Sequence, residues 1–402
     1  MISLERHLEI NSQNFLVIIK LLRSAGASAR IVGGAVRDAL LNLPCSDIDI
    51  ATDMLPDEVI VLLQKNRIKV MPTGIKFGTV TALIKDESFE ITTLRADIDC
   101  DGRHADVIYS KDFAEDAARR DFTINALSYC PLKGVVYDYF GGIKDLEARK
   151  VIFIGQADQR IKEDYLRILR FFRFSCRYSA KIDQEGLKAC AAYKEGLQNL
   201  SFERIKSEMD LLLTLNGSPN ILFCMSEEGI LAQILPVNDY DVNLHLKALE
   251  MSDKFKAKID ACIVYAILFN NTKLSYGQLL SLKFSRTEAK NIIKMLALKE
   301  IKDINELIVE LKNIWLDEVQ SLLYFIYASL IVSNPKLVYD LHTELSSLKI
   351  PICPVDGNHL LALGYRGKEV GYSLNLIKKA WIESNFSLDH GALIDLVKNN
   401  EK

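Results

Sequence analysis

The segment Gly33–Asp38, which reads GGAVRD, is followed by the triplet Asp47-Ile48-Asp49, and these two stretches indicate the architecture of the N-terminal part of the chain. In an extended strand, side chains at positions i and i+2 point to the same face, so the carboxylates of Asp47 and Asp49 lie side by side while the intervening isoleucine packs behind them. The paired glycines precede a helical stretch and open a tight turn. The pattern predicts a strand, a helix and a second strand that carries two neighbouring acids.

Two anions held this close favour a cation. Magnesium prefers oxygen ligands, takes one or two protein carboxylates and completes its octahedron with water and substrate phosphates. Asp47 and Asp49 are therefore candidate Mg²⁺ ligands and candidate catalytic residues. Gly33 and Gly34 let the backbone approach a triphosphate, and Arg37 supplies a charge-assisted donor to the same phosphates. Either motif alone is common on surface turns, but their combination in a strand-helix-strand context favours a nucleotide site.

The chain around these motifs divides into two halves. From about residue 30 to 155, glycines separate short alternating runs, which predict strands over 30–33, 46–50, 78–84 and 88–94 and helices over 35–43 and 56–65. From about residue 156, glycines become sparse and apolar residues recur every three or four positions, which predicts helices. The sequence therefore predicts an α/β domain followed by a helical half.

Length and composition indicate a multidomain globular protein. The chain has 402 residues, 49% hydrophobic and 26% charged, which exceeds one ordinary domain and is typical of a packed rather than a disordered protein. It contains no apolar run of about eighteen residues and no signal-peptide pattern, which predicts a cytoplasmic protein without a membrane partner. The eight cysteines and six histidines are dispersed, so neither a disulfide framework nor a zinc site is predicted. The net charge of −3 argues against a surface coated in basic residues.

Glu90 is a third candidate catalytic carboxylate. It lies in the alternating run Ser88–Leu94, where Phe89 and Ile91 pack to one side and Glu90 shares the opposite face with Thr92. Beside the aspartate pair, Glu90 would complete a site for two metal ions, one activating an attacking hydroxyl and the other stabilising a leaving pyrophosphate. Taken alone, a solvent-facing strand glutamate is the simpler interpretation.

The segment Ala118–Asn125, which reads ARRDFTIN, is a candidate for nucleotide contacts. It combines guanidinium donors with an acceptor and an amide, groups suited to holding a ribose and a phosphate. Arg120, Asp121 and Asn125 are the candidates in this segment. An Arg-Arg-Asp run also occurs as a salt bridge at the end of a helix, so this motif is weak on its own.

A helix expected over residues 161–174 presents a stripe of arginines. Arg167, Arg170 and Arg173 advance in steps of three from Asp164 along one face, and apolar side chains form the opposite face. Three arginines on a helix are usually a solvated surface, but this stripe contains few acids to balance it. An Asp three residues before an Arg places an acceptor next to a donor, which is the arrangement that a nucleobase edge requires.

These motifs, taken in order, resemble one known family. The chain carries GGAVRD, DIDIAT, FEITTLR, RRDFTINAL, EDYLRILRFFRF and LSFERI between about residues 30 and 215, as do the class II tRNA nucleotidyltransferases (CCA-adding enzymes) and the bacterial poly(A) polymerases. The resemblance implies an α+β fold, with an N-terminal polymerase-β-like nucleotidyltransferase head followed by an all-helical neck, body and tail. The implied parts are a catalytic head over 1–150, a neck that selects the nucleobase over 151–215, a body over 216–330 and a tRNA-binding tail over 331–402.

The resemblance also implies a role for each motif. Asp47 and Asp49 would hold magnesium, with Glu90 as the third carboxylate. The residues implied to contact the incoming nucleotide are Gly34, Arg37, Arg120, Asp164, Arg167, Arg170 and Arg173. The implied reaction is attack of an RNA 3′-hydroxyl on the α-phosphorus of the nucleotide, with release of pyrophosphate and without a nucleic-acid template.

The chemistry of base selection follows from the pairing edges. Cytosine and adenine each offer an amino donor next to an acceptor, so a carboxylate beside a guanidinium satisfies either base. Uracil and guanine present a carbonyl oxygen where the carboxylate expects a donor, which costs about 1–3 kcal/mol per unpaired group. Asp164 and Arg167 are therefore predicted to select CTP and ATP.

Members of the family differ in their product, which is CCA, CC, a final A or a poly(A) tail. The segment Ala96–Val107 resembles the flexible loop of complete CCA-adding enzymes, and the end at Lys398–Lys402 lacks the basic extension of bacterial poly(A) polymerases. Both features favour a CCA tRNA nucleotidyltransferase, with a poly(A), CC-only or A-only enzyme as alternatives. A catalytically inactive RNA-binding relative would have lost a metal carboxylate, and a small-molecule nucleotidyltransferase would lack the arginine helix. No motif bears on the oligomeric state.

Overall fold

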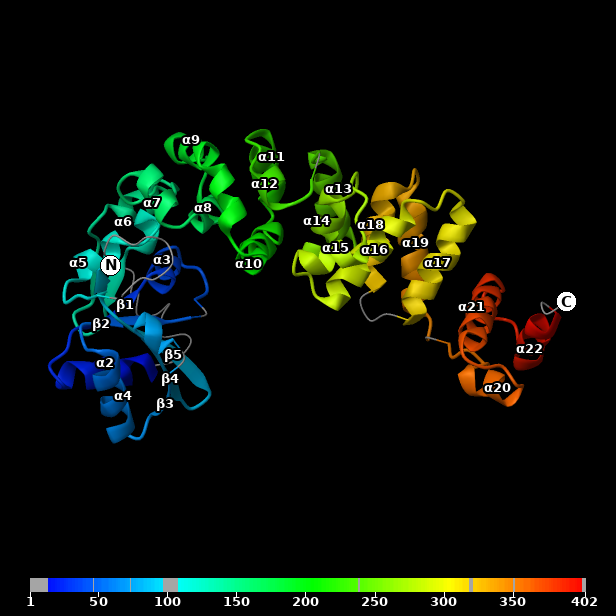
Figure 1. The fold of residues 1–402 in the computed structure, drawn as a ribbon, viewed down its shortest axis with the longest axis horizontal. Helices are drawn as coiled ribbons and strands as arrows, with labels where there is room; N and C mark the ends of the chain where they lie inside the picture. Colours follow the sequence, from blue (N-terminus) through cyan, green and yellow to red (C-terminus); the bar gives the residue numbers. More distant parts are fainter. Residues whose placement is uncertain are drawn as a thin grey trace. The chain divides into compact units, whose positions relative to one another are not determined.

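The computed structural model of this chain describes residues 14–45, 47–72, 74–96, 108–237, 239–317, 321–349 and 351–399. The chain divides into two compact units (Figure 1). Unit 1 comprises Met1–Met209 and Glu228–Gln233, and unit 2 comprises Asp210–Glu227 and Ile234–Lys402. Unit 1 contains the β-sheet and unit 2 is helical, which confirms the predicted α+β fold. The finer division into head, neck, body and tail stays a prediction.

Seven strands form the sheet of unit 1, in the order β3-β4-β5-β2-β1-β8-β9. β2 and β5 pair in parallel, and the other neighbours pair antiparallel. The strands are β1 Ala29–Val32, β2 Asp49–Thr52, β3 Lys69–Met71, β4 Thr79–Ile84, β5 Glu87–Thr93, β8 Ser128–Cys130 and β9 Val135–Tyr137. A separate two-stranded ribbon joins β6 Arg95–Ala96 to β7 Ile108–Tyr109. The strand expected over 46–50 begins later, at Asp49.

One face of the sheet is buried under α2 (Asn14–Ser24) and α4 (Pro56–Lys65). Ile31, Ile50 and Ile91 point from the strands into a core that also includes helix residues such as Leu22 and Leu63. Burial of each such side chain contributes about 1.5–3 kcal/mol to stability. Because α2 and α4 cover this face, the alternate side chains of β2 and β5 are left on the opposite face.

The remaining elements of unit 1 are mostly short helices that follow the sheet strands. They are α3 Gly34–Leu40, η1 Ile75–Phe77, α5 Phe113–Ala118, η2 Thr123–Asn125, α6 Gly142–Glu147, α7 Ala157–Glu163, α8 Leu166–Tyr178, α9 Gln184–Ala192 and η3 Lys194–Asn199. Two further helices cross the boundary: α10 Phe202–Leu213 continues into unit 2 after Met209, and α12 Leu231–Ile234 belongs to unit 1 except for its last residue. α8 buries an aromatic cluster in which Phe171 stacks on Phe153 with ring centroids 5.4 Å apart. This packing attaches the first helices after the sheet to the sheet domain itself.

Unit 2 is built around α18, which is buried on all sides. Tyr324, Phe325 and Tyr327 have no exposed surface, because an apolar helix must be covered by others all round. Its helices are α11 Ser218–Glu227, α13 Val242–Lys254, α14 Ala261–Leu268, α15 Tyr276–Ser281, α16 Arg286–Leu298, α17 Ile304–Asp317, α18 Ser321–Ile331, α19 Pro335–Ser347, α20 Gly357–Ala362, α21 Lys368–Glu383 and α22 His390–Asn399. Nowhere in the described ranges is a helix both long and apolar enough to cross a bilayer.

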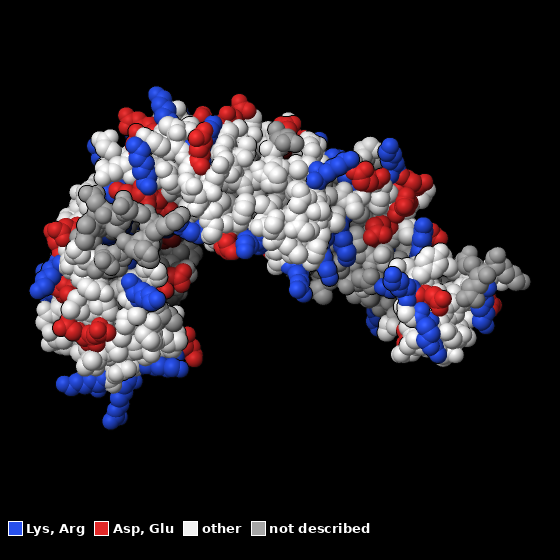
Figure 2. Space-filling model, in the orientation of Figure 1, with Lys and Arg blue, Asp and Glu red and all other residues white. Residues whose placement is uncertain are grey.

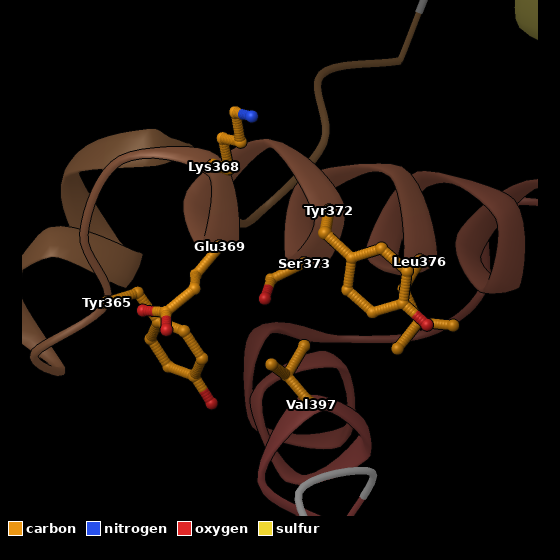
Figure 3. Close-up of a pocket in the computed structure, with 7 residues that line it drawn as sticks. All are labelled: Tyr365, Lys368, Glu369, Tyr372, Ser373, Leu376 and Val397. Atoms are coloured by element: carbon orange, nitrogen blue, oxygen red, sulfur yellow. The ribbon is translucent and has the colours of Figure 1, made fainter.

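The three C-terminal helices have a small core of their own, which includes Leu360, Ile377 and Trp381. A pocket of about 370 Å³ lies between α21 and α22, with Tyr372 on α21 and Val397 on α22 among the lining side chains (Figure 3). The lining is mainly apolar and includes none of the residues predicted to bind a nucleotide. The chemistry predicted from the sequence therefore belongs to unit 1.

Candidate active site

Two of the three predicted carboxylates, Asp49 and Glu90, lie on the open face of the sheet, and Asp47 lies just before β2. Asp49 begins β2 and is the direct neighbour of Glu90 on the parallel strand β5. Both residues are exposed, as is Asp47, whereas Ile50 and Ile91 are buried on the other face. The alternation predicted from the sequence is therefore confirmed for both strands.

The electrostatics of Asp49 show that these acids are crowded. The pKa of Asp49 is raised to about 6, mainly because its carboxylate is partly removed from water and because Glu90 is negatively charged. Asp47 adds a smaller effect in the same direction, and the positive charge of Arg120 acts in the opposite direction. The residue is exposed at the surface as a whole, so the effect comes from the close surroundings of the carboxylate. Oxygen ligands that repel one another in this way are the kind of donors that a hard divalent cation stabilises.

The described part of the chain contains no group of three or more His, Cys, Asp or Glu side chains placed to hold a metal ion alone. Magnesium needs only one or two protein carboxylates, because it takes its other ligands from water and substrate phosphates. Asp47 and Asp49 can supply such a pair of oxygen ligands. Glu90 lies next to Asp49 in the sheet and is available as the third carboxylate.

The guanidinium of Arg120 packs against the turn at Gly33. Gly33 has a φ of 70°, in the left-handed region that favours glycine. A Cβ atom at this position would lie 2.9 Å from Nη1 of Arg120, so a side chain here would displace the end of the Arg120 side chain. Arg120 donates to the backbone oxygen of Asn125 at 3.3 Å and to Asp116 at 3.2 Å. The positive charge of Arg120 also opposes the rise in the pKa of Asp49, so this guanidinium lies close to both the glycine turn and the carboxylates.

Arg37 is buried, with 6% of its surface exposed. Its Nε donates to Asp38 at 2.8 Å, and its Nη1 donates to the side-chain oxygen of Asn125. The guanidinium carbon lies 4.2 Å from the ring centroid of Tyr178 on α8, and a Cβ on Gly34 would lie 3.4 Å from Nη2. In this structure the donors of Arg37 serve internal contacts that attach α3 to α8, and its predicted role at the triphosphate stays a prediction.

Asp121 and Asn125 belong to a buried hydrogen-bond network. Asp121 accepts from the backbone N–H of Phe122 at 2.9 Å, from Nδ2 of Asn125 at 2.9 Å and from Nε of Arg170 at 2.7 Å. Burial would raise the pKa of Asp121, but the charge of Arg170 and these hydrogen bonds outweigh it and hold the pKa below its ordinary value. The network fixes the positions of Arg170 and, through Asn125, of Arg37.

The arginine stripe has acidic partners from outside its own helix. The single helix expected over 161–174 is divided into α7 and α8, and Asp164 lies between them in an extended conformation with φ −155° and ψ 106°. Arg170 and Arg173 pair with Glu208 of α10 at 3.3 and 2.6 Å. The expectation that few acids balance the stripe is therefore wrong, because Asp121 and Glu208 approach it from other elements.

Asp164 and Arg167 lie at the junction of the two helices. Arg167 pairs with Glu163 at 2.5 Å and donates to the backbone oxygen of Arg119 at 3.0 Å. Asp164 accepts from Nη2 of Arg204 at 2.8 Å, and its side chain is 33% exposed. Arg204 and Glu208 were not among the predicted site residues. The only sequence signal for Arg204 was its place in the LSFERI motif.

The two predicted clusters belong to the same unit and are joined through one peptide segment. Arg167 contacts Arg119, and the next residue, Arg120, acts on Asp49. The carboxylates predicted to be catalytic and the side chains predicted to read the base are therefore connected by consecutive residues of one chain segment. The predicted flexible loop, Ala96–Val107, lies outside the described residues except for the backbone of its first residue.

Comparisons with known proteins give a consistent result. The family model described as the Poly A polymerase head domain matches residues 29–152. The mitochondrial CCA tRNA nucleotidyltransferase 1 of Homo sapiens is 35% identical over 393 residues, covering 92% of this chain and 86% of the relative. The CCA-adding enzyme of Lactobacillus johnsonii is 30% identical over 392 residues, covering 96% of each chain. The crystal structure of the Bacillus stearothermophilus CCA-adding enzyme in complex with CTP has a TM-score of 0.75 and 25% identity, covering 97% of each chain.

Proposed function

The chain belongs to the CCA-adding enzyme family of tRNA nucleotidyltransferases, and from this premise we propose that it adds CMP and AMP, from CTP and ATP, to the 3′ end of tRNA. The observation that carries the proposal is the pairing of Asp49 with Glu90 on the open sheet face, with Asp47 close enough to contribute to the raised pKa of Asp49. The same unit contains the base-reading pair, Asp164 and Arg167. The cytoplasmic location stays a prediction from the sequence, since the relatives include a mitochondrial enzyme.

Nucleotidyltransferases of this kind use divalent metal ions, and we propose Mg²⁺ held by Asp47 and Asp49. When bound, the ion lowers the pKa of the attacking hydroxyl and neutralises charge on the departing pyrophosphate. The chain's own contribution is to fix the ligands: β2 pairs with β5, which places Asp49 beside Glu90. Arg120 adds a positive charge between the carboxylates and the Gly33 turn, where we place the triphosphate of the nucleotide.

The proposed reaction is an in-line displacement at the α-phosphorus. The 3′-hydroxyl oxygen of the RNA forms a bond to the α-phosphorus, the bond between that phosphorus and the bridging oxygen to the β-phosphate breaks, and pyrophosphate leaves. The hydroxyl proton passes to solvent or to a neighbouring carboxylate. The residues proposed to orient the nucleotide for this step are Gly33, Gly34, Arg37, Arg120, Asp121, Asn125, Asp164, Arg167, Arg170 and Arg173. Arg37, Asp121 and Asn125 would act by positioning other groups, because they are buried in the network described above.

One assay tests this function. The purified chain is offered a tRNA that ends at its discriminator base, with CTP alone, ATP alone or both, and an unstructured RNA with both. CCA addition predicts two added nucleotides with CTP alone, three with both, and little extension of the unstructured strand. Long tails from ATP would instead identify a poly(A) polymerase, and a stop after two additions with both nucleotides a CC-adding enzyme.

The variant Asp164→Ala is expected to relax base selection. Without the carboxylate, the carbonyl oxygens of uracil and guanine no longer face an acceptor, so the ratio of kcat/KM for CTP over UTP should fall by about 10- to 100-fold. The metal requirement should not change, because Asp164 lies outside the carboxylate cluster. Single-turnover addition of each nucleotide to tRNA measures the ratio.

A matched control for this variant is Asp158→Ala, which removes an exposed carboxylate from the neighbouring α7. It should keep the selectivity of the parent. If Asp164→Ala is as selective as Asp158→Ala, the proposed base-reading role of Asp164 is wrong, and the family assignment is unaffected.

A further inference from the structure

Asp38, the last residue of the GGAVRD segment, is a carboxylate to which the proposed reaction assigns no role. Charged side chains are spread over the surface in Figure 2, where water solvates them, whereas Asp38 is buried on α3. Its Oδ1 accepts from Nε of Arg37 at 2.8 Å and from the hydroxyl of Tyr178 on α8 at 2.9 Å. Its Oδ2 lies 3.6 Å from Nη2 of Arg177, also on α8. A buried charge requires such partners to compensate for the loss of water, so these contacts fix the position of the carboxylate.

Tyr178 contacts both Asp38 and the arginine that Asp38 holds. Burial is the main reason that the pKa of Tyr178 is raised to about 12, so its hydroxyl keeps the proton that it donates to Asp38 throughout the neutral range. Its ring covers the guanidinium of Arg37, with 4.2 Å between the guanidinium carbon and the ring centroid. The three side chains therefore form a closed set of mutual contacts between α3 and α8, in which none can move without disturbing the other two.

The three nitrogens of the Arg37 guanidinium lie against three different groups. Nε donates to Asp38, Nη1 donates to the side-chain oxygen of Asn125, and Nη2 lies against Gly34, where an added Cβ would be 3.4 Å away. Asn125 in turn presents its backbone oxygen to Nη1 of Arg120 at 3.3 Å, and Arg120 packs against the glycine turn. Because a guanidinium is planar and its donors form a fixed fork, the bond from Nε to the carboxylate sets the direction of the other two nitrogens.

We propose that Asp38 is a positioning residue for the triphosphate of the incoming nucleotide. It acts through Arg37, whose guanidinium it orients against the glycine turn. The inference rests on the proposed function, which places the triphosphate at that turn. Tyr178 attaches the same carboxylate to α8, the helix that carries the arginine stripe. Loss of Asp38 should therefore weaken the binding of the phosphates more than the binding of the nucleoside.

The test measures nucleotide binding by the full chain with Asp38→Ala, in the presence of Mg²⁺ and without tRNA. We expect the Kd for CTP to rise about tenfold, and the Kd for CMP, which lacks the β- and γ-phosphates, to change by less than about twofold. Asp38→Asn retains an oxygen that can accept from Nε of Arg37 and from Tyr178, so it should restore the Kd for CTP to within about threefold of the parent. Calorimetric titration measures the Kd for CTP, and displacement of bound CTP measures the Kd for CMP.

Asp183→Ala is the matched control for a loss of stability alone. Asp183 belongs to the same unit and caps α9, where it accepts from the backbone N–H of Gly186 at 2.8 Å, so its removal costs about 0.5–2 kcal/mol. Both Kd values of this control should equal those of the parent. If the ratio of the Kd for CTP to the Kd for CMP is the same in Asp38→Ala and Asp183→Ala, the inference is overturned and Asp38 is a structural ion-pair partner only.

Tyr178→Phe is the second variant, for the case that Asp38→Ala does not fold. It removes the hydroxyl that donates to Asp38 and keeps the ring that covers Arg37, so the Kd for CTP should rise about threefold while the Kd for CMP stays unchanged. An unchanged ratio in that case would overturn the inference. The binding measurement also separates the two proposals, since a parent whose CTP binding depends on Asp38 but which adds no nucleotide to tRNA would refute the proposed function alone.

Discussion

The variant Asp49→Asn is expected to lose nucleotide addition by roughly 10³-fold while it remains folded. The substitution removes one of the two carboxylates proposed to hold the metal ion, whose charge stabilisation contributes several kcal/mol to the transition state. Asp49 is exposed, and its backbone pairing within the sheet does not depend on the side chain. Addition of CMP to tRNA, followed over a range of Mg²⁺ concentrations, measures the loss.

The same variant is expected to be more resistant to heat than the parent at neutral pH. The folded-state pKa of Asp49 is about 6, above its ordinary value of 3.8, so the folded chain disfavours the ionised carboxylate. The stability of the parent therefore decreases as the pH rises from 3.8 to 6 and stays lower above 6. The neutral amide of Asp49→Asn removes this penalty. Conversely, the metal affinity of the parent should fall as the pH drops through 6, because a proton then competes for the carboxylate.

Asp57→Asn is the matched control for Asp49→Asn. Asp57 is an exposed aspartate in the first turn of α4, and α4 covers the opposite face of the sheet. Its replacement should change neither activity nor the response to Mg²⁺. Activity of Asp49→Asn within tenfold of this control would show that the carboxylate cluster on the open sheet face is not the catalytic centre.

The variant Asp121→Ala is expected to destabilise unit 1 by about 3–5 kcal/mol, the usual result of removing one partner from a buried ion pair. The Asp121 side chain is 8% exposed. Its loss removes the acceptor of the Asn125 amide and the nearer of the two acidic partners of Arg170. Glu208 retains a contact with Arg170 at 3.3 Å, which places the expected loss toward the lower end of the range. Calorimetry of the full chain should show one transition moving to lower temperature.

Glu163→Ala is the contrasting variant for Asp121→Ala. Glu163 pairs with Arg167 of the same arginine stripe, but its side chain is 34% exposed, and such pairs contribute at most about 1 kcal/mol. Tryptophan fluorescence adds an internal control, because both tryptophans, Trp315 and Trp381, belong to unit 2. A shift of the fluorescence transition in Asp121→Ala, or equal destabilisation by the two variants, would contradict the assignment of Asp121 as a buried structural anion.

The sequence predicted the parts of the fold that depend on local periodicity. The helix over 56–65 is observed with those bounds, since it is defined locally by a proline in its first turn and by buried positions that recur after three and four residues. The faces of Asp49 and Glu90 were also predictable, because a strand with one buried face allows a single register for its side chains. The sequence alone therefore predicts that Asp49 and Glu90 lie on the unburied face of the sheet, even without knowledge of the order of the strands.

The partners of the arginine stripe were not predictable in this way. Glu208 lies 38 residues after Arg170 and 35 after Arg173, so no local pattern connects them. The interruption of the helix at Asp164 was also not predictable, because the apolar positions of α7 and α8 continue with nearly the same period across it. Packing of α10 against α8, a long-range contact, decides which arginines are paired with acids.

Arg167 donates to the main-chain oxygen of Arg119, the residue next to the one that acts on Asp49. A substitution of Arg167 is therefore expected to loosen the segment that presents Arg120 to the proposed catalytic acids. Variants of Arg167 made to accept UTP or GTP should therefore show a lower kcat as well as a lower selectivity for CTP and ATP. Asp164, anchored instead by Arg204, offers a starting point at which fidelity can be changed with less effect on turnover.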